Sequence, residues 1–307
     1  MVSVIVPNYN HSDFLNLRLD SIFNQTFQDF EVIILDDAST DLSKGVIEKY
    51  RTHKKLSHII YNNVNSGSTF CQWKKGINLA KGEFIWIAES DDFSSLNFIE
   101  KLLPYLLFDK DVSIVFSDSN VVDEKSYKID NTKKWSPNIH GFRKIFEKSN
   151  TVIGRQICFS EFCFYNIFPN TSSIISRKSV LLKNISFLDV KMKNSGDWKF
   201  WFYIALDSKV AYHDESLNYF RKHTSNVTSS LLTMKLEALD MLKDLLKLEL
   251  TTYERTQVST SILLWSFNPA IWINNISFNR SNLRYYFKKN ISIRAVIKFI
   301  FYFVENV

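Results

Sequence analysis

The chain has 307 residues, of which 45% are hydrophobic and 23% are charged, and only 7 are glycine. This composition is typical of a globular protein and argues against a disordered chain or a repeat array. Lysine and arginine exceed aspartate and glutamate by 38 − 32 = 6. The surplus suits an anionic ligand or an anionic membrane surface, but also an ordinary solvated face, and we expect no nucleic-acid partner because no basic run stands out.

The cysteines and the N-terminus suggest a compartment. The chain has three cysteines, an odd number, and they are scattered and have no histidine nearby: Cys71, Cys158 and Cys163. This pattern favours a reducing compartment and argues against a disulfide framework or a zinc site. An apolar strand is expected from Val2, which leaves no room for a signal peptide, and no run of about 20 apolar residues is free of charge. We therefore expect a cytoplasmic protein.

The first part of the chain alternates between two hydrophobic patterns. Short apolar runs predict buried strands, and apolar residues at helical spacing predict helices between them. The expected strands are 2–6, 30–35, 57–61, 84–88 and 112–116, and helices are expected from about residues 12, 42, 69 and 96. This alternation predicts a doubly wound, mostly parallel sheet, whose ligands bind beyond the carboxyl ends of the strands.

The second part is less regular. Residues 125–137 are polar and predict a mobile loop or a small hairpin, and residues 159–168 are crowded with aromatics. We expect a strand at 172–175, helices from residue 178 and over 196–206, two closing strands at 210–212 and 217–220, and helices beyond residue 230. The sequence thus predicts an α/β domain at 1–228 and a helical extension at 229–307.

Carboxylates are concentrated where the fourth strand ends. Glu89, Asp91 and Asp92 follow a buried apolar run. Like charges this close need a cation or hydrogen-bond donors, and a hard divalent metal such as Mg²⁺ or Mn²⁺ beside a diphosphate would supply the cation. Alternatively an aspartate here could cap the next helix, although a cap explains only one of the three.

Two other strand ends carry candidate ligand residues. Asp37 ends the second strand and could accept an N–H from a nucleotide base, or form an Asx turn. Tyr9 follows Pro7-Asn8 at the first strand end and could lie against a base or ribose, or belong to the core.

The loop after the third strand contains Gly67, which permits a left-handed turn or a close approach to phosphate. On the following helix, Lys74 or Lys75 could pair with phosphate, although solvated lysines would look the same.

Three residues of the second part could also carry chemistry. Asp197 begins an apolar helix and could act as a general base, or favour the helix N-terminus electrostatically. His223 could be a metal ligand or a phosphate donor, or a histidine with a structural role. Arg221, two residues earlier, could contact phosphate.

Together these motifs resemble the inverting nucleotide-sugar glycosyltransferases of glycosyltransferase family 2, which have the GT-A fold. The matching segments, in the family's order, are residues 2–10, 35–41, 65–67, 82–92 and 196–198. Two departures occur: Glu89 stands where the family commonly has aspartate, and Gln72-Trp73-Lys74 stands where an Arg-Asn pair is common.

The resemblance implies roles for individual residues. Tyr9 and Asp37 are expected at the nucleotide base, Asp91 at the ribose and Asp92 on Mg²⁺ or Mn²⁺, with Asp197 as the catalytic base. Pro7, Gly67 and Lys74 are expected on the donor side, and His223 matches a histidine often found after the sheet. The acceptor site is not predicted.

The resemblance implies an enzyme that moves a sugar from a UDP- or dTDP-type donor to a hydroxyl of a glycan or lipid-linked acceptor, in bacterial surface polysaccharide synthesis. Two alternatives are a catalytically silent sugar-nucleotide-binding scaffold and a nucleotidyltransferase, for which a glycine-rich phosphate loop is missing. Residues 291–304 are apolar with two basic residues, which favours either peripheral contact with the inner face of the plasma membrane or packing on the protein.

Overall fold

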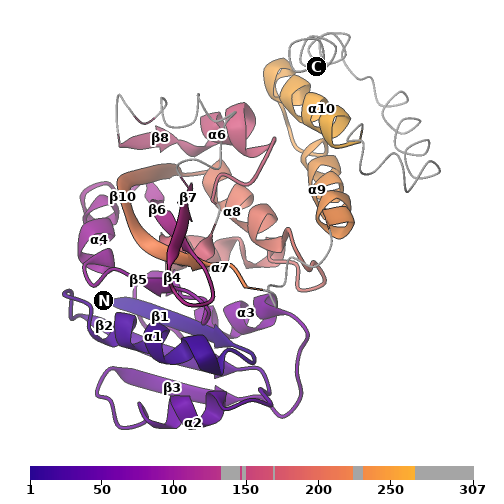
Figure 1. Cartoon of the computed structure of the whole chain (residues 1–307). Helices are drawn as coiled ribbons and strands as arrows, with labels where there is room; N and C mark the ends of the chain where they lie inside the picture. The colour runs from indigo at the N-terminus through magenta and orange to yellow at the C-terminus, as the bar shows by residue number, and fades with distance from the viewer. Residues whose placement is uncertain (133–145, 147–149, 169, 224–230, 267–307) are drawn as a thin grey trace.

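The computed structural model describes residues 1–132, 146, 150–168, 170–223 and 231–266 and contains a mixed ten-stranded sheet with helices on both faces (Figure 1). The strand order is β3-β2-β1-β4-β9-β6-β10-β5, with β7 beside β6 and β8 beside β10. The strands are β1 Val2–Asn8, β2 Phe30–Asp36, β3 Leu56–Tyr61, β4 Phe84–Ile87, β5 Phe93–Ser94, β6 Val112–Val122, β7 Lys128–Asn131, β8 Thr151–Ile153, β9 Ile174–Arg177 and β10 Lys209–Arg221. The helices include α1 Ser12–Phe23, α2 Ser43–Glu48, α3 Thr69–Leu79, α4 Phe98–Phe108, α6 Gly154–Ile157, α7 Lys178–Lys183, α8 Gly196–Leu206, α9 Leu231–Leu245 and α10 Thr252–Ser266.

The parallel strands β3, β2, β1 and β4 form the part of the sheet that the alternation predicted. β1, β2 and β4 are buried along their whole length because both faces of the sheet are covered there, whereas the edge strand β3 is half-buried and contains Ser57 and His58. Val4 and Val6 belong to one buried core, whereas Ile5, between them, belongs to the other. This is the two-residue period of a strand, and it explains why no polar position interrupts β1 between Val4 and Val6.

Each core takes its helices from different parts of the chain. Leu19 of α1 and Leu102 of α4 pack in the first core, with Val4 and Val6. The second core contains Trp73 of α3 and Phe200 of α8, and Leu242 of α9 also packs there. The described part of the helical extension therefore shares a core with the sheet, and helices from the first and second halves of the chain meet on one face.

The predicted sheet is confirmed, with two corrections in its second half. β6 continues through the polar residues Ser117–Asn120, and the two expected closing strands are one long strand, β10. The polar side chains are tolerated inside the sheet because they bond across it: Asn218 donates to Ser119 Oγ at 3.1 Å. Register shifts near His213 and Ser216 let β10 stay paired with β6 across this region.

Two expectations for the remaining segments have different outcomes. In the polar insert, β7 pairs with β6 in an antiparallel hairpin, as one of the two alternatives predicted. The candidate membrane-contact segment, 291–304, lies outside the described residues. None of the described helices combines the length and the apolar character needed to cross a membrane.

The close packing of α3 on β1 can be tested at Gly76 of α3. A Cβ atom at this position would lie 2.4 Å from Ile5 Cγ2, so Gly76→Ala forces α3 away from β1. Overpacking of this kind costs about 1–3 kcal/mol. The matched control is Gly45→Ala in α2, where a Cβ meets nothing within 4 Å and the reduced chain entropy should stabilise by about 0.5–1 kcal/mol. Urea unfolding measures both changes, and equal stability of the two variants would contradict the packing described.

Candidate active site at the carboxyl ends of the strands

The carboxyl ends of β2, β1 and β4 lie side by side, and β1 and β2 are bonded to each other there. The Asn8 side-chain amide donates to Asp36 Oδ2 at 2.8 Å. The N–H of Asp37 donates to the carbonyl of Asn8 at 2.9 Å. Pro7 lies in β1, in register with Leu35, whereas Tyr9 is 44% exposed. The exposure of Tyr9 rules out the alternative that it is a core residue and leaves its ring available at this edge of the sheet.

Asp37 is the acceptor that organises the loop after β3. Its carboxylate accepts hydrogen bonds from Asn62 Nδ2 at 2.6 Å and from Ser66 Oγ at 2.7 Å. Its backbone carbonyl accepts from Asn65 Nδ2 at 3.1 Å. In this structure the Asp37 side chain is buried and fixes the 62–66 loop at the strand end. Its expected contact with a nucleotide base stays a prediction.

The same loop contains the predicted glycine. Gly67 has a φ of +70°, the left-handed conformation that glycine adopts without steric cost. Its carbonyl accepts from Lys193 Nζ at 2.8 Å, which joins the loop to the segment before α8. Lys74 is half-buried on α3, and its expected phosphate contact stays a prediction. The neighbouring Lys75 donates to Asn62 Oδ1 at 2.8 Å.

Two adjacent residues of α3 reach two different strand ends. Gln72 Nε2 donates to Asp37 Oδ1 at 2.8 Å, and Trp73 Nε1 donates to Glu89 Oε1 at 2.7 Å. These residues occupy the position where the family commonly has an Arg-Asn pair. Gln72 and Trp73 therefore connect the ends of β2 and β4 into one site.

The carboxylates after β4 do not cap a helix, because α4 begins at Phe98, with Asn97 at its N-cap. Burial and then the charge of Asp91 raise the pKa of Glu89 to about 8. A buried arginine, Arg18 of α1, supplies compensating charge: its Nε donates to the Glu89 carbonyl at 2.9 Å. Burial lowers the pKa of Arg18 to about 10, against the attraction of these carboxylates.

Asp92 is enclosed on both carboxylate oxygens. Oδ2 accepts from Asn170 Nδ2 at 2.8 Å, and Oδ1 accepts from the backbone N–H of Arg221 at 2.9 Å. The residue is 1% exposed, and burial, followed by the charge of Asp91, raises its pKa to about 6. Each oxygen of Asp92 thus accepts one hydrogen bond from the protein in this structure, and its expected role as a metal ligand stays a prediction.

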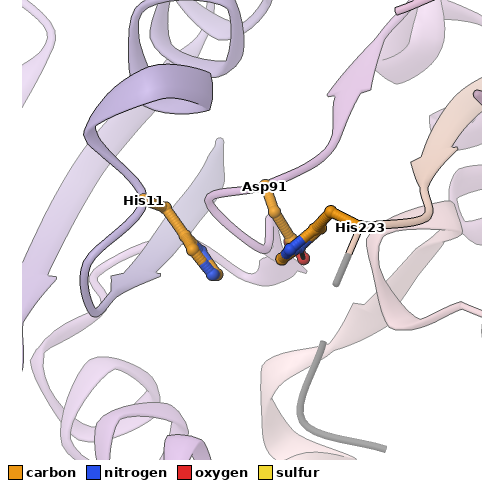
Figure 2. A group of neighbouring side chains, drawn as sticks. All are labelled: His11, Asp91 and His223. Atoms are coloured by element: carbon orange, nitrogen blue, oxygen red, sulfur yellow. Dashed lines mark hydrogen bonds and ion pairs between the residues drawn. The ribbon is translucent and has the colours of Figure 1, made fainter. Parts of the chain in front are cut away.

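The neighbouring aspartate lies in a different environment. Asp91 Oδ2 is 3.1 Å from His223 Nε2, and a second histidine, His11, faces the pair (Figure 2). One potential ligand atom from each of the three side chains lies within 4.8 Å of the others. Burial opposes ionisation of Asp91, but the two histidines outweigh it and the pKa of Asp91 is lowered. This set of one carboxylate and two imidazoles could hold a divalent cation.

The rim of the site beside His223 is built around Arg221. A cavity of 490 Å³ is lined by Asp123, Lys222 and His223, among others. Arg221 itself is 1% exposed, and its Nε donates to the Asp91 carbonyl at 2.8 Å while Nη1 donates to the Asp123 carbonyl at 2.8 Å. These bonds tie the end of β10 to the acidic segment and to the β6–β7 turn. Arg221 is therefore part of the framework, and the proposed phosphate contact has no support here.

Asp197 lies in the first turn of α8, as predicted. Its Oδ2 accepts from Asn166 Nδ2 at 3.2 Å. Burial raises the pKa of Asp197 to about 6, although the Trp198 backbone N–H and Asn166 lower it. A carboxylate of this kind is ionised at neutral pH and is still basic enough to accept a proton.

One short segment connects Asp197 with the acidic centre. Asn166 contacts Asp197, and Asn170, four residues later, contacts Asp92. The structure thus brings Asp91, Asp92 and His223 together, and links them to Asp197 on one side and, through Gln72-Trp73, to Asp37 on the other. His11 and Asn166 were not among the predicted site residues. His11 directly follows the 2–10 motif, whereas no sequence pattern marks Asn166.

Comparisons with known proteins agree with this arrangement. A sequence model described as glycosyl transferase family 2 matches residues 3–167. An uncharacterized glycosyltransferase of Haemophilus influenzae is 27% identical over 230 residues, which cover 75% of this chain and 68% of the relative. A poly(ribitol-phosphate) beta-glucosyltransferase of Bacillus spizizenii is 36% identical over 112 residues, 36% of this chain and 17% of the relative.

Two solved structures share the fold. TarS 1–349 of S. aureus in complex with UDP has a TM-score of 0.66 at 20% identity, and the match covers 90% of this chain and 74% of that one. The mannosyltransferase PcManGT of Pyrobaculum calidifontis, in complex with GDP-Man and Mn²⁺, has a TM-score of 0.58 at 13% identity, with coverage of 97% and 83%. The expected GT-A fold is confirmed, and because the family match spans more than half of the sequence, the chain belongs to glycosyl transferase family 2.

Proposed function

We propose that this glycosyltransferase moves a sugar from a UDP- or dTDP-type donor to a hydroxyl acceptor with inversion at the anomeric carbon. The observation that carries the proposal is the half-buried Asp197, which is bonded to Asn166, four residues before the Asn170 that bonds Asp92. In an inverting transfer one carboxylate takes the proton of the attacking hydroxyl, and a pKa of about 6 suits that task.

The residues would divide the work as follows. Asp197 accepts the acceptor's proton, and Asn166 orients the carboxylate. Tyr9 lies against the nucleotide base, and Asp37 holds the loop that contains Gly67 near the diphosphate. The exposure of Tyr9 and the φ of +70° at Gly67 support these assignments.

The donor set around Asp91 supports a site for Mg²⁺ or Mn²⁺. We assign the ion to Asp91 and His223 rather than to Asp92, because the potential ligand atoms that gather within 4.8 Å of one another include those of Asp91 and His223 and none of Asp92. Asp92 is 1% exposed and bonded to other parts of the protein. The bound ion would neutralise charge that develops on the departing nucleoside diphosphate. Asp92 would instead fix the backbone of Arg221 beside the site.

The proposed acceptor and the proposed cellular location are inferred from similar proteins. The poly(ribitol-phosphate) beta-glucosyltransferase of B. spizizenii resembles about a third of this chain. It supports a role in bacterial surface polysaccharide synthesis, with a glycan or lipid-linked acceptor. Peripheral contact with the inner face of the membrane through residues 291–304 stays a prediction, because this segment lies outside the described residues.

We propose that the region from residue 229 onward is an extension that positions the catalytic base. Glu237 of α9 accepts three backbone N–H groups that precede α8: Oε1 from Lys193 at 2.6 Å, and Oε2 from Asn194 at 2.9 Å and Ser195 at 2.8 Å. Ser195 is the N-cap of α8, the helix that carries Asp197. The extension thus fixes the start of that helix.

The first prediction concerns the base. Asp197→Asn should abolish sugar transfer while UDP binding, measured by calorimetry, stays within a factor of about two, because the amide keeps the shape of the carboxylate but cannot take a proton. The control is Asp207→Asn at the other end of α8, whose side chain is 62% exposed. Transfer is measured as nucleoside diphosphate release from a panel of UDP-, dTDP- and GDP-sugars with Mn²⁺. If the wild-type chain binds a donor but releases nothing with any acceptor, the silent scaffold is favoured.

The pH dependence of the reaction tests the same carboxylate. The base acts when deprotonated, so kcat/KM for the acceptor should fall as the pH drops below about 6. Burial also raises the pKa of Asp92 to about 6, so the acidic limb alone is ambiguous. The variant Asn166→Ala distinguishes the two carboxylates. Because Asn166 lowers the pKa of Asp197, its removal should raise that pKa and move the fall in kcat/KM to higher pH. If the fall in kcat/KM stays at the same pH in this variant, Asp197 is not the base.

The role of the extension is tested by Glu237→Ala. Three backbone N–H groups lose their acceptor and the start of α8 loosens, so kcat should fall roughly tenfold to a hundredfold while the Kd of UDP is unchanged. Asp240→Ala, one turn along α9, removes a carboxylate whose side chain is 73% exposed and should leave kcat as it is. Equal kcat values for the two variants would refute the positioning role.

A further inference from the structure

His11 is the member of the histidine–aspartate cluster that no motif assigned. It precedes α1 directly, at the N-cap position, and makes no capping hydrogen bond with its side chain. Its ring lies edge-on to that of His223, with centroids 5.4 Å apart and an interplanar angle of 88°. In Figure 2 the imidazole of His11 points toward Asp91 and His223 from the opposite side.

Ser90 fixes the orientation of the His11 ring. The His11 Nδ1 atom is 2.8 Å from Ser90 Oγ, and Ser90 is 1% exposed. When Nδ1–H donates to the serine oxygen, the lone pair of Nε2 is free. A hydrogen bond that holds the second ring nitrogen in this way is the usual support of a histidine that binds a metal.

The spacing in the cluster suits ligands of one ion. Asp91 Oδ2 and His223 Nε2 are 3.1 Å apart, which is close to the roughly 3 Å that separates neighbouring ligands with metal bonds of about 2.1 Å. The third ligand atom lies within 4.8 Å of both. The other acids are engaged elsewhere, since Glu89 accepts from Trp73 and Asp92 from Asn170.

We propose that His11 is a third protein ligand of the divalent cation and that it sets the metal preference of the enzyme. The inference rests on the proposed metal site at Asp91 and His223 and extends it. Two imidazoles and one carboxylate suit transition-metal ions, with Zn²⁺ and Co²⁺ bound more tightly than Mn²⁺, whereas Mg²⁺ prefers oxygen ligands throughout. His11 therefore biases the site toward the softer ions.

The test uses the full chain with UDP and Mn²⁺ and needs no turnover. Pulsed electron paramagnetic resonance counts the imidazole nitrogens bound to Mn²⁺: we expect two in the wild type and one in His11→Ala. Calorimetry should show Mn²⁺ affinity falling about 10- to 100-fold in His11→Ala, the scale on which metal-site changes act, with a smaller fall for Mg²⁺. His11→Asp keeps three ligands and should shift the preference toward Mg²⁺.

A matched control is available on β3. His58 also places Nδ1 beside a serine oxygen, at 3.1 Å from Ser57 Oγ, but lies outside the cluster. His58→Ala should leave the Mn²⁺ spectrum and affinity unchanged, and thermal unfolding verifies that each variant is folded. A single imidazole in the wild type, or unchanged nitrogen coupling in His11→Ala, would overturn the role of His11 and leave His223 and the proposed function intact. Absence of Mn²⁺ binding with UDP present would overturn the metal site itself.

Discussion

The site depends on three carboxylates crowded together after β4, of which Asp92 is buried and Glu89 and Asp91 are half-buried. An ionised side chain that leaves water costs several kcal/mol unless donors or opposite charges replace its hydration. The partners come from elements spread over most of the chain: Trp73 of α3 for Glu89, His223 after β10 for Asp91, and Asn170 for Asp92. The acidic centre can therefore exist only when the whole sheet and its covering helices are assembled, so the fold and the site form together.

The three acids after β4 have different partners, and their pKa values therefore differ. Burial and the charge of Asp91 raise the pKa of Glu89 to about 8, and the same causes raise that of Asp92 to about 6. The two histidines lower the pKa of Asp91 despite its burial. Negative charge at neutral pH is thus held most firmly on Asp91, the acid that also faces the imidazoles. The placement of the two imidazoles around Asp91, more than the number of acids, supports the proposed cation at that position.

The alternation of strands and helices was enough to predict the sheet and the edge where the polar strand ends meet, because both follow from local periodicity. The division of roles between Asp91 and Asp92 was not accessible in this way. The donors that enclose Asp92 are 78 and 129 residues away in the sequence. For the same reason the polar residues Ser117–Asn120 indicated the end of a strand, whereas their cross-strand partners keep β6 continuous. The two departures from the family pattern also become intelligible together, since Trp73 donates to the longer Glu89.

The family match ends at residue 167, before the helix that carries Asp197. The strand ends, the acidic segment and the loop with Gly67 all belong to the matched part, whereas Asp197 and Glu237 come from the part that follows. Their joint placement needs a physical link, which the second core and the bonds of Asn166, Asn170 and Glu237 provide. The proposed nucleotide site and the proposed base come from different halves of the chain, so each can vary separately as long as these linking contacts keep their relative position.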